Sequence, residues 1–333
     1  MTGAYHPVSF TTWNPERGWL SREARRRTVL AIPGLHRYSE AMSDEFFSAL
    51  LPGSGLRVVA ALTTEVSREA RRLHKAEDGS AALLSEALTA VTLLGALQKE
   101  KTRVSLQLEC DGPVRGVFVD ADAGSLRGYV KQPGLAVLGA EGTFHWRPLL
   151  GNRGYLSVLR DMGEDEYYRS SVELEAFELG HDLERYFAVS EQVESVVRIR
   201  TVPSGREVLG AAGGVLLQKL PDGDAGALAE AGVRLTPAAL DRALLEANGS
   251  GPALLRALFP GAEVDVLAKR PLEFRCGCSR ERVHRALLAL GQAELEDLLA
   301  TDGQAEATCE FCTTRYVIPG DELRTLIAGA SPR

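Results

Sequence analysis

Several features that would assign a chain at once to a large functional class are missing here. The 333 residues carry a formal net charge of -7, whereas nucleic-acid-binding domains are usually basic. The longest apolar run, Ala87–Leu97, is too short to cross a bilayer and indicates a buried helix. No secretory signal is recognisable, because Arg25–Arg27 is not followed by a long apolar segment. We therefore expect a cytoplasmic protein that binds neither membrane nor nucleic acid.

The motifs of common catalytic sites are missing as well. There is no Gly-x-Ser-x-Gly nucleophile elbow and no His-Glu-x-x-His metal motif, and the six histidines are scattered. Gly210–Gly214 lacks the lysine of a phosphate-binding loop, so we interpret it as a tight turn. His284, on a predicted helix, is interpreted as a surface histidine rather than a metal ligand. We expect the protein not to be an enzyme.

Cysteine is scarce and unevenly distributed. Of five cysteines, four lie near the C-terminus, as Cys276-Gly-Cys278 and Cys309-Glu-Phe-Cys312. Two close thiolate pairs supply the four sulfur ligands of a tetrahedral structural zinc site, and cytosolic thiols stay reduced. The same thiols could instead close as two local disulfides, so the segment predicts a zinc site, a redox switch or both. Cys110 is expected on the inward face of a strand, as an inert core residue.

The first two thirds of the chain mix helix and strand patterns. Strict alternation over Arg103–Cys110 predicts a half-buried strand, and the largely apolar Ser80–Gln98 predicts a buried helix. The other expected strands are Val114–Asp120, Tyr155–Arg160, Tyr167–Leu174 and Val193–Val202, and the other expected helices are Thr64–Leu73 and Phe177–Ser190. Because strands and helices do not alternate regularly, the pattern indicates an α+β fold in which helices pack on a β-sheet.

Composition divides the chain into four parts, namely an N-terminal extension (1–34), an α+β core domain (35–221), a helical linker (222–271) and a C-terminal domain (272–333). The linker is rich in Ala, Leu and Gly, and Thr236-Pro237 is a good helix start. Helices of about ten residues are marginal alone in water, so the linker must dock on a neighbour. The C-terminal domain has few large apolar residues, and we expect it to fold with zinc and to be largely unfolded without it.

The segment Glu273–Arg282, which reads Glu-Phe-Arg-Cys-Gly-Cys-Ser-Arg-Glu-Arg, closely resembles the redox-switch motif of the 33-kilodalton heat shock protein family. The second half of that motif is matched by Cys309–Cys312, with Tyr316 after it. Similar core motifs lie upstream at Gly112-Pro113, Arg127–Val130, Arg185–Gln192 and Ala211–Gln218. The resemblance covers the chain from about Leu35 to its end, and residues 1–34 depart from the shorter family pattern.

This resemblance implies a redox-regulated, ATP-independent holdase that binds unfolding client proteins under oxidative stress. The reduced form would be inactive and would hold one zinc ion on Cys276, Cys278, Cys309 and Cys312. Oxidation would form the disulfides Cys276–Cys278 and Cys309–Cys312 and release zinc. The C-terminal domain and the linker would then unfold, client-binding surface would be exposed, and active homodimers would form.

Two other functions are compatible with the cysteine pattern. A thiol-disulfide oxidoreductase would use Cys309 and Cys312 as its active pair, but it needs that pair at a helix N-terminus, and strands are predicted on both sides. A zinc-ribbon adaptor is compatible with the basic residues that flank the first pair, Arg275, Arg280 and Arg282. The acidic charge of the whole chain disfavours a nucleic-acid partner for such an adaptor.

Overall fold

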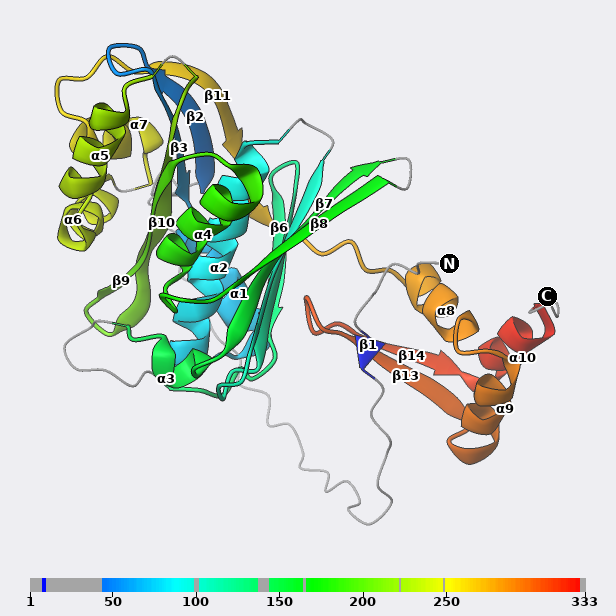
Figure 1. Ribbon diagram of the computed structural model, residues 1–333. Coiled ribbons are helices and arrows are strands. Elements are labelled where there is room, and N and C mark those ends of the chain that lie inside the picture. Colours follow the sequence, from blue (N-terminus) through cyan, green and yellow to red (C-terminus); the bar gives the residue numbers. More distant parts are fainter. Residues whose placement is uncertain are drawn as a thin grey trace, which may run out of the picture. The chain divides into compact units, whose positions relative to one another are not determined.

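The computed structural model describes residues 8–9, 44–98, 102–136, 144–163, 166–221, 223–247 and 249–329 (Figure 1). The chain divides into two compact units, Met42–Cys276 and a smaller one that joins Gly277–Arg333 to Met1–Ala41. The fold is mixed, with both helices and β-sheets, which confirms the predicted α+β class. Each unit has its own hydrophobic core and is described separately.

Two sheets form the larger unit. The first has the order β11 (Asp265–Pro271), β2 (Glu45–Leu51), β3 (Leu56–Leu62), β10 (Glu207–Lys219) and β9 (Ser195–Ser204). The second has the order β12 (Glu273–Phe274), β6 (Ser125–Val130), β5 (Gly116–Asp122), β4 (Arg103–Cys110), β7 (Gly154–Gly163) and β8 (Glu166–Glu173). The pairings are antiparallel except that of β12 with β6, which is parallel.

Helix α2 (Asp78–Ala96) packs against strands of both sheets and is the centre of the main core (Figure 1). It is long and apolar enough to cross a membrane by length and composition, but 89% of that window is buried inside the protein. This confirms the buried helix predicted from Ser80–Gln98. The other helices around this core are α1 (Thr64–His74), α3 (Arg147–Leu150), α4 (Leu179–Tyr186) and the π-helical turn η1 (Phe187–Glu191).

Strand β4 has the bounds that its alternation predicts. Val104, Leu106 and Leu108 are buried and the residues between them are partly exposed, because successive side chains of a strand point to opposite faces. Cys110 ends the strand partly buried and packs against the core. Burial also raises the pKa of its thiol, in agreement with an inert core residue.

The prediction of a tight turn at Gly210–Gly214 was wrong, because these residues lie inside strand β10. The glycines are needed for space. A Cβ on Gly213 would lie 2.4 Å from the carbonyl oxygen of Ala61 and 2.7 Å from Cδ2 of Leu244. The absence of a side chain lets β10 approach both the neighbouring strand and a helix of the predicted linker.

The predicted linker forms three helices, α5 (Ala225–Arg234), α6 (Pro237–Ala247) and α7 (Gly251–Leu258), followed by strand β11. Thr236 caps α6 as predicted, since its Oγ1 accepts a hydrogen bond from the amide of Ala239 at 3.2 Å. The helices pack on the face of the first sheet that points away from α2. A second core joins the sheet residues Val58, Leu62, Val215 and Leu217 to the helix residues Leu228, Leu240, Leu244 and Leu254. The predicted docking of the linker is therefore confirmed.

The smaller unit contains β13 (Gln304–Cys309), β14 (Arg315–Pro319), α8 (Arg280–Leu288), α9 (Gln292–Thr301) and α10 (Gly320–Gly329). Strand β1 (Val8–Ser9) pairs with β13, with Val8 opposite Cys309. Among the described residues of this unit the buried apolar core is small and consists of Val283, Leu287, Leu295, Ala305, Ala307, Ile318 and Leu323. A core of this size supplies little stability, which makes an additional staple such as a metal important.

Candidate metal centre

Two short segments present the four clustered cysteines. Cys276 and Cys278 lie on the extended stretch between β12 and α8, which begins after Ser279. Ser279 caps α8 by accepting a hydrogen bond from the amide of Arg282, so the stretch ends at a fixed point. Cys309 is the last residue of β13, and Cys312 lies in the turn before β14.

The turn that carries the second pair is closed by two backbone hydrogen bonds. The amide of Cys309 donates to the carbonyl of Thr314 at 2.9 Å, and the amide of Thr313 donates to the carbonyl of Cys309 at 2.8 Å. Thr313 adopts a left-handed conformation with φ 59°, which the tight turn requires. The turn brings the sulfurs of Cys309 and Cys312 within 4.8 Å of each other.

The four sulfur atoms all lie within 4.8 Å of one another, and Sγ of Cys278 is 3.4 Å from Sγ of Cys312. Zinc–sulfur bonds of about 2.3 Å in a tetrahedron place the sulfurs roughly 3.8 Å apart, so the arrangement fits a four-coordinate ion. All four cysteines are free thiols and partly buried. Four close cysteines of this kind can hold a metal ion, and an all-sulfur tetrahedron is the donor set of zinc or of iron–sulfur centres.

Neighbouring polar groups orient these sulfurs. The hydroxyl of Tyr316 donates a hydrogen bond of 3.0 Å to Sγ of Cys278, and this bond, with burial and the other thiols, raises the pKa of Tyr316. Oγ1 of Thr314 lies 3.2 Å from Sγ of Cys312. Groups that form hydrogen bonds to metal-ligating side chains hold those side chains in place and tune their charge. Tyr316 was found in the sequence through its position after the second pair.

Arg127 is the group that spacing alone could not reveal, because it lies on β6, far along the chain from Cys276. Burial lowers the pKa of Arg127, but Asp120 and the Cys276 thiol raise it by more. The guanidinium forms two hydrogen bonds of 2.7 and 2.8 Å to Asp120. It therefore presents a fixed positive charge beside Cys276 and favours the thiolate form.

The other candidates from the sequence lie outside the cluster. His284 is on α8, where its Nε2 lies 2.5 Å from Oε1 of Glu322 rather than among the sulfurs. Arg280 also pairs with Glu322, through Nε at 2.8 Å, and Arg275 pairs with Glu273 at 3.4 Å. Two of the three predicted basic neighbours thus form ion pairs with carboxylates.

The family of the chain follows from comparison with known proteins. The family model described as Hsp33 protein matches residues 44–319, and the chain therefore belongs to the Hsp33 family. The 33 kDa chaperonin of Geobacter sulfurreducens is 35% identical over 290 residues, which are 86% of this chain and 96% of that protein. The 33 kDa chaperonin of Listeria monocytogenes is 34% identical over 289 residues, which are 86% of this chain and 98% of that protein.

A solved structure agrees. The crystal structure of the 33 kDa chaperonin of Thermotoga maritima matches with a TM-score of 0.75 at 28% identity, over 86% of this chain and 98% of that one. Both the fold and the family were predicted from the sequence, and both are confirmed. As a member of a chaperone family, the protein binds other proteins as clients.

Proposed function

We propose that this protein is a redox-regulated, ATP-independent holdase of the bacterial cytoplasm. In the reduced state one zinc ion is held by Cys276, Cys278, Cys309 and Cys312, and the protein is inactive. Oxidants form two disulfides, zinc leaves, and the C-terminal domain (272–333) and the linker (222–271) unfold. The core domain (35–221) then binds unfolding proteins and prevents their aggregation, as a homodimer.

The observation that carries this proposal is the group of four free thiols within 4.8 Å of one another, three of which belong to the smaller unit with its small core. Structural zinc contributes roughly 10–16 kcal/mol of apparent stability at neutral pH, more than a core of this size. Zinc binds thiolates and not disulfide sulfurs. The fold of the smaller unit is therefore linked to the redox state of its cysteines.

Each disulfide forms by a balanced two-electron step. One hydrogen peroxide accepts two electrons from a pair of thiolates, two protons are taken up, and two water molecules leave as the sulfur–sulfur bond forms. We propose the pairs Cys276–Cys278 and Cys309–Cys312, which the resemblance to the Hsp33 family implies. Two molecules of peroxide per chain therefore oxidise all four cysteines, and zinc is released.

Only residues 272–275 separate the end of the linker from Cys276, so the linker can respond to the loss of metal. The amide of Arg275 donates to the carbonyl of Leu126 at 2.8 Å, and the amide of Leu272 donates to the carbonyl of Asp44 at 2.8 Å. These backbone bonds hold the segment between the linker and Cys276 on the larger unit. We expect these two hydrogen bonds to break first when the cysteine segment unfolds.

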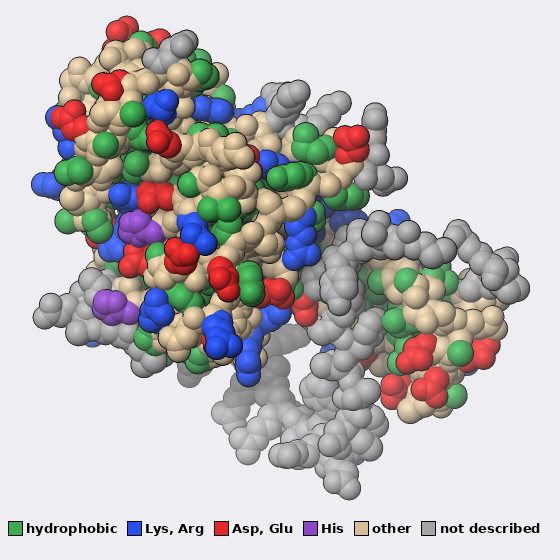
Figure 2. Space-filling view, in the orientation of Figure 1, with side chains coloured by type: hydrophobic (Ala, Val, Ile, Leu, Met, Phe, Trp, Pro, Cys, Tyr) green, Lys and Arg blue, Asp and Glu red, His purple; other side chains and the backbone are tan. Residues whose placement is uncertain are grey.

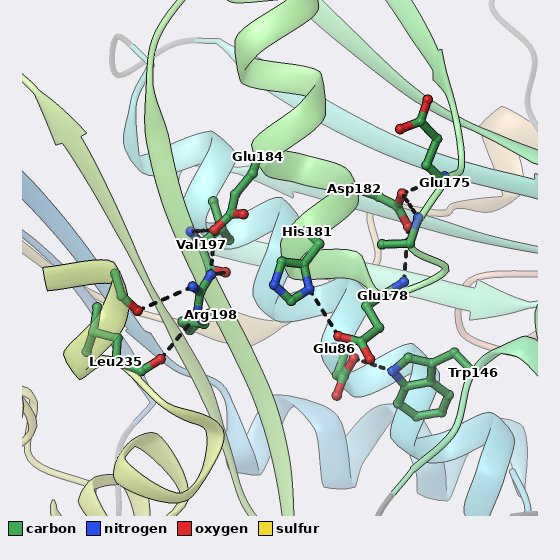
Figure 3. A network of polar contacts seen from close by, with 12 residues as sticks. Glu86, Trp146, Glu175, Glu178, His181, Asp182, Glu184, Val197, Arg198 and Leu235 are labelled. Atoms are coloured by element: carbon green, nitrogen blue, oxygen red, sulfur yellow. Dashed lines mark hydrogen bonds and ion pairs between the residues drawn. The ribbon is translucent and has the colours of Figure 1, made fainter. Parts of the chain in front are cut away.

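The linker helices are held by apolar contacts and by a few polar ones. Arg198 on β9 donates to the backbone carbonyl of Leu235 at 3.1 Å and pairs with Glu184 at 2.5 Å (Figure 3). When the helices leave, the face of the first sheet around Val58, Leu62, Val215 and Leu217 becomes exposed. An apolar surface of this kind is suited to unfolded clients.

The direct test is light scattering of a heat-unfolding enzyme in the presence of the chaperone. Protein treated with peroxide should suppress aggregation, and reduced zinc-loaded protein should not. The Cys110→Ser variant is the matched control, because it removes a thiol outside the cluster and should behave like the wild type. Equal suppression in both redox states would leave zinc a merely structural role.

The two alternatives have less support. Cys309 ends a strand and Cys312 lies in a turn before another strand, so the pair lacks the helix N-terminus that activates oxidoreductase thiols. On the face of the larger unit in Figure 2, basic and acidic side chains of the described residues are interspersed, with no broad basic patch for nucleic acid. Insulin reduction and salt-sensitive RNA binding would each reveal these activities.

A further inference from the structure

Strand β11 is attached to the larger unit mainly through its backbone. It pairs with β2 in antiparallel register from Asp265 opposite Leu50 to Pro271 opposite Glu45, with a shift between Val266 and Ala268. None of its side chains is fully buried, and those of Val266 and Leu267 are 53% and 59% exposed. Strand β2, in contrast, is almost entirely buried. Backbone pairing of this kind does not depend on the sequence of the added strand.

The packing beside β11 is incomplete. A cavity of ≈ 100 Å³ is lined by residues of β2, α2, β5, β6 and β11, among them Phe46, Thr92, Ala121, Leu126, Ala268 and Leu272. Strand β11 contributes Ala268 and Arg270 to the lining, and the side chain of Ala268 is only a methyl group. The lining mixes apolar residues with Thr92, Thr102 and Arg270, and unfilled space of this kind weakens the attachment of the strand next to it. A bulkier apolar side chain in the position of Ala268 would fit this cavity better.

One buried charge marks the same edge. Nζ of Lys269 lies 2.7 Å from Oε2 of Glu45, whose side chain is only 7% exposed, and it also lies over the ring of Phe47 at 5.3 Å. The amide of Gly251, at the start of α7, donates to the same carboxylate at 3.3 Å. Two parts of the linker therefore contact the Glu45 carboxylate: Lys269 neutralises its charge, and the amide of Gly251 donates a hydrogen bond to it. When they leave, a carboxylate at the edge of β2 requires a new cation.

We propose that the edge of β2 and the cavity beside it are a client-binding groove, which β11 occupies in the resting protein. The occupant in the active state is an extended segment of an unfolded protein, added as a strand to β2. Its recognition unit is a bulky apolar residue, which enters the cavity, followed by Lys or Arg, which pairs with Glu45. Strand β11 has the same arrangement in Ala268-Lys269, with a side chain too small for the cavity. This inference rests on the proposed function, because β11 must leave before a client can bind.

Hydrogen exchange of the full oxidised chain tests this groove. The probe is reduced and carboxymethylated α-lactalbumin, which stays unfolded and has no thiols to exchange, and its binding is followed separately by gel filtration. Exchange of the β2 amides (Glu45–Leu51) should slow at least about tenfold when the client is bound, because strand addition protects amides. Binding of the client with unchanged exchange in β2 would overturn the groove and leave the proposed function intact. A chain that binds no client would overturn the proposed function and this inference together.

Two peptides test the recognition unit. Both have the sequence of residues 263–272, one with Ala268→Leu and one with Ala268→Asp, and both compete for the oxidised full chain against the same client. The leucine peptide should compete at least about tenfold better, since a leucine side chain gains contacts with Phe46 and Leu126, whereas a carboxylate buried beside these apolar side chains is costly. The Glu45→Gln variant should bind the leucine peptide several-fold more weakly and retain binding of a version with Lys269→Ala. Equal competition by the two peptides would overturn the assignment of the cavity.

Discussion

Arg200 on β9 and Asp241 on α6 form a two-pronged ion pair, with Nε at 2.6 Å from Oδ1 and the terminal nitrogen at 3.0 Å from Oδ2. Both side chains are largely buried, with 21% and 27% exposed. The pair joins the core sheet to the middle helix of the linker. A bidentate arginine–carboxylate pair is among the stronger side-chain interactions, so it acts as a latch between the two.

Opening this latch should partly activate the reduced protein. Asp241→Asn removes the charge and should weaken docking of α6 by about 1–3 kcal/mol. Reduced, zinc-loaded Asp241→Asn should then suppress client aggregation to a measurable degree, and limited proteolysis should cut residues 222–271 faster. Arg234→Gln is the matched control, since its pair with Glu230 is exposed and lies within α5. Equal behaviour of the two variants would argue against the latch.

The start of α7 offers a second way to loosen the linker. A Cβ on Gly251 would lie 1.5 Å from Cε2 of Phe47, whose ring is buried, so Gly251→Ala must displace α7 or the ring. Overpacking of this kind costs about 1–3 kcal/mol. We expect faster proteolysis of the linker in the reduced protein and activation at lower peroxide. Gly134→Ala, which meets open space, should change neither.

Loss of one proposed zinc ligand should unfold the C-terminal domain. Cys309→Ser leaves three thiolates, so zinc binding weakens and much of the roughly 10–16 kcal/mol of metal-linked stability is lost. Zinc content per chain and protease resistance of residues 272–333 should both fall in the reduced variant. The control variant Cys110→Ser should keep one zinc per chain. If residues 272–333 stay resistant to protease in Cys309→Ser, this domain folds without the metal.

The pH dependence of stability should report on Glu86. Burial raises the pKa of Glu86 to about 8, against the smaller lowering effects of Arg200 and of the Trp146 indole, which donates a 2.8 Å hydrogen bond (Figure 3). The folded state therefore holds this proton more tightly than the unfolded state. The resulting stability is fully present below about pH 4.5 and is lost as the pH rises towards 8.

Glu86→Gln removes this dependence and keeps an acceptor for Trp146. In urea unfolding of the reduced protein, the variant should gain stability relative to the wild type by up to about 1.4 kcal/mol for each pH unit between 5 and 8. Comparison at equal pH cancels the pH dependence of zinc binding, which the two proteins share. A stability difference that does not change with pH would mean that Glu86 does not titrate in this range.

Periodicity predicted the elements whose burial depends on one face. The alternation of β4 and the apolar length of α2 are local properties, and the structure confirms both. The cap of α6 by Thr236 is also a local signal. The two cysteine pairs could be predicted to meet because a structural zinc site takes four sulfur ligands, and the four sulfurs lie within 4.8 Å of one another.

The missed elements depend on partners far along the chain. Strands β2 and β3 are buried on both faces and show no alternation, and β11 is an edge strand with exposed side chains in the predicted linker. The glycines of β10 resemble a turn in sequence and become a strand only because Ala61 and Leu244 approach closely. Arg127 reaches Cys276 only through the parallel pairing of β12 with β6.

The most direct test of the account is a peroxide titration in which zinc release and client protection are measured on the same sample. Zinc is followed with a chromophoric chelator, and protection is followed by light scattering of a heat-unfolding enzyme at mild heat. The account predicts that both curves rise together and reach their plateau near one zinc per chain. Full protection before zinc is released, or full release without protection, would contradict the coupling between the metal centre and the client-binding surface.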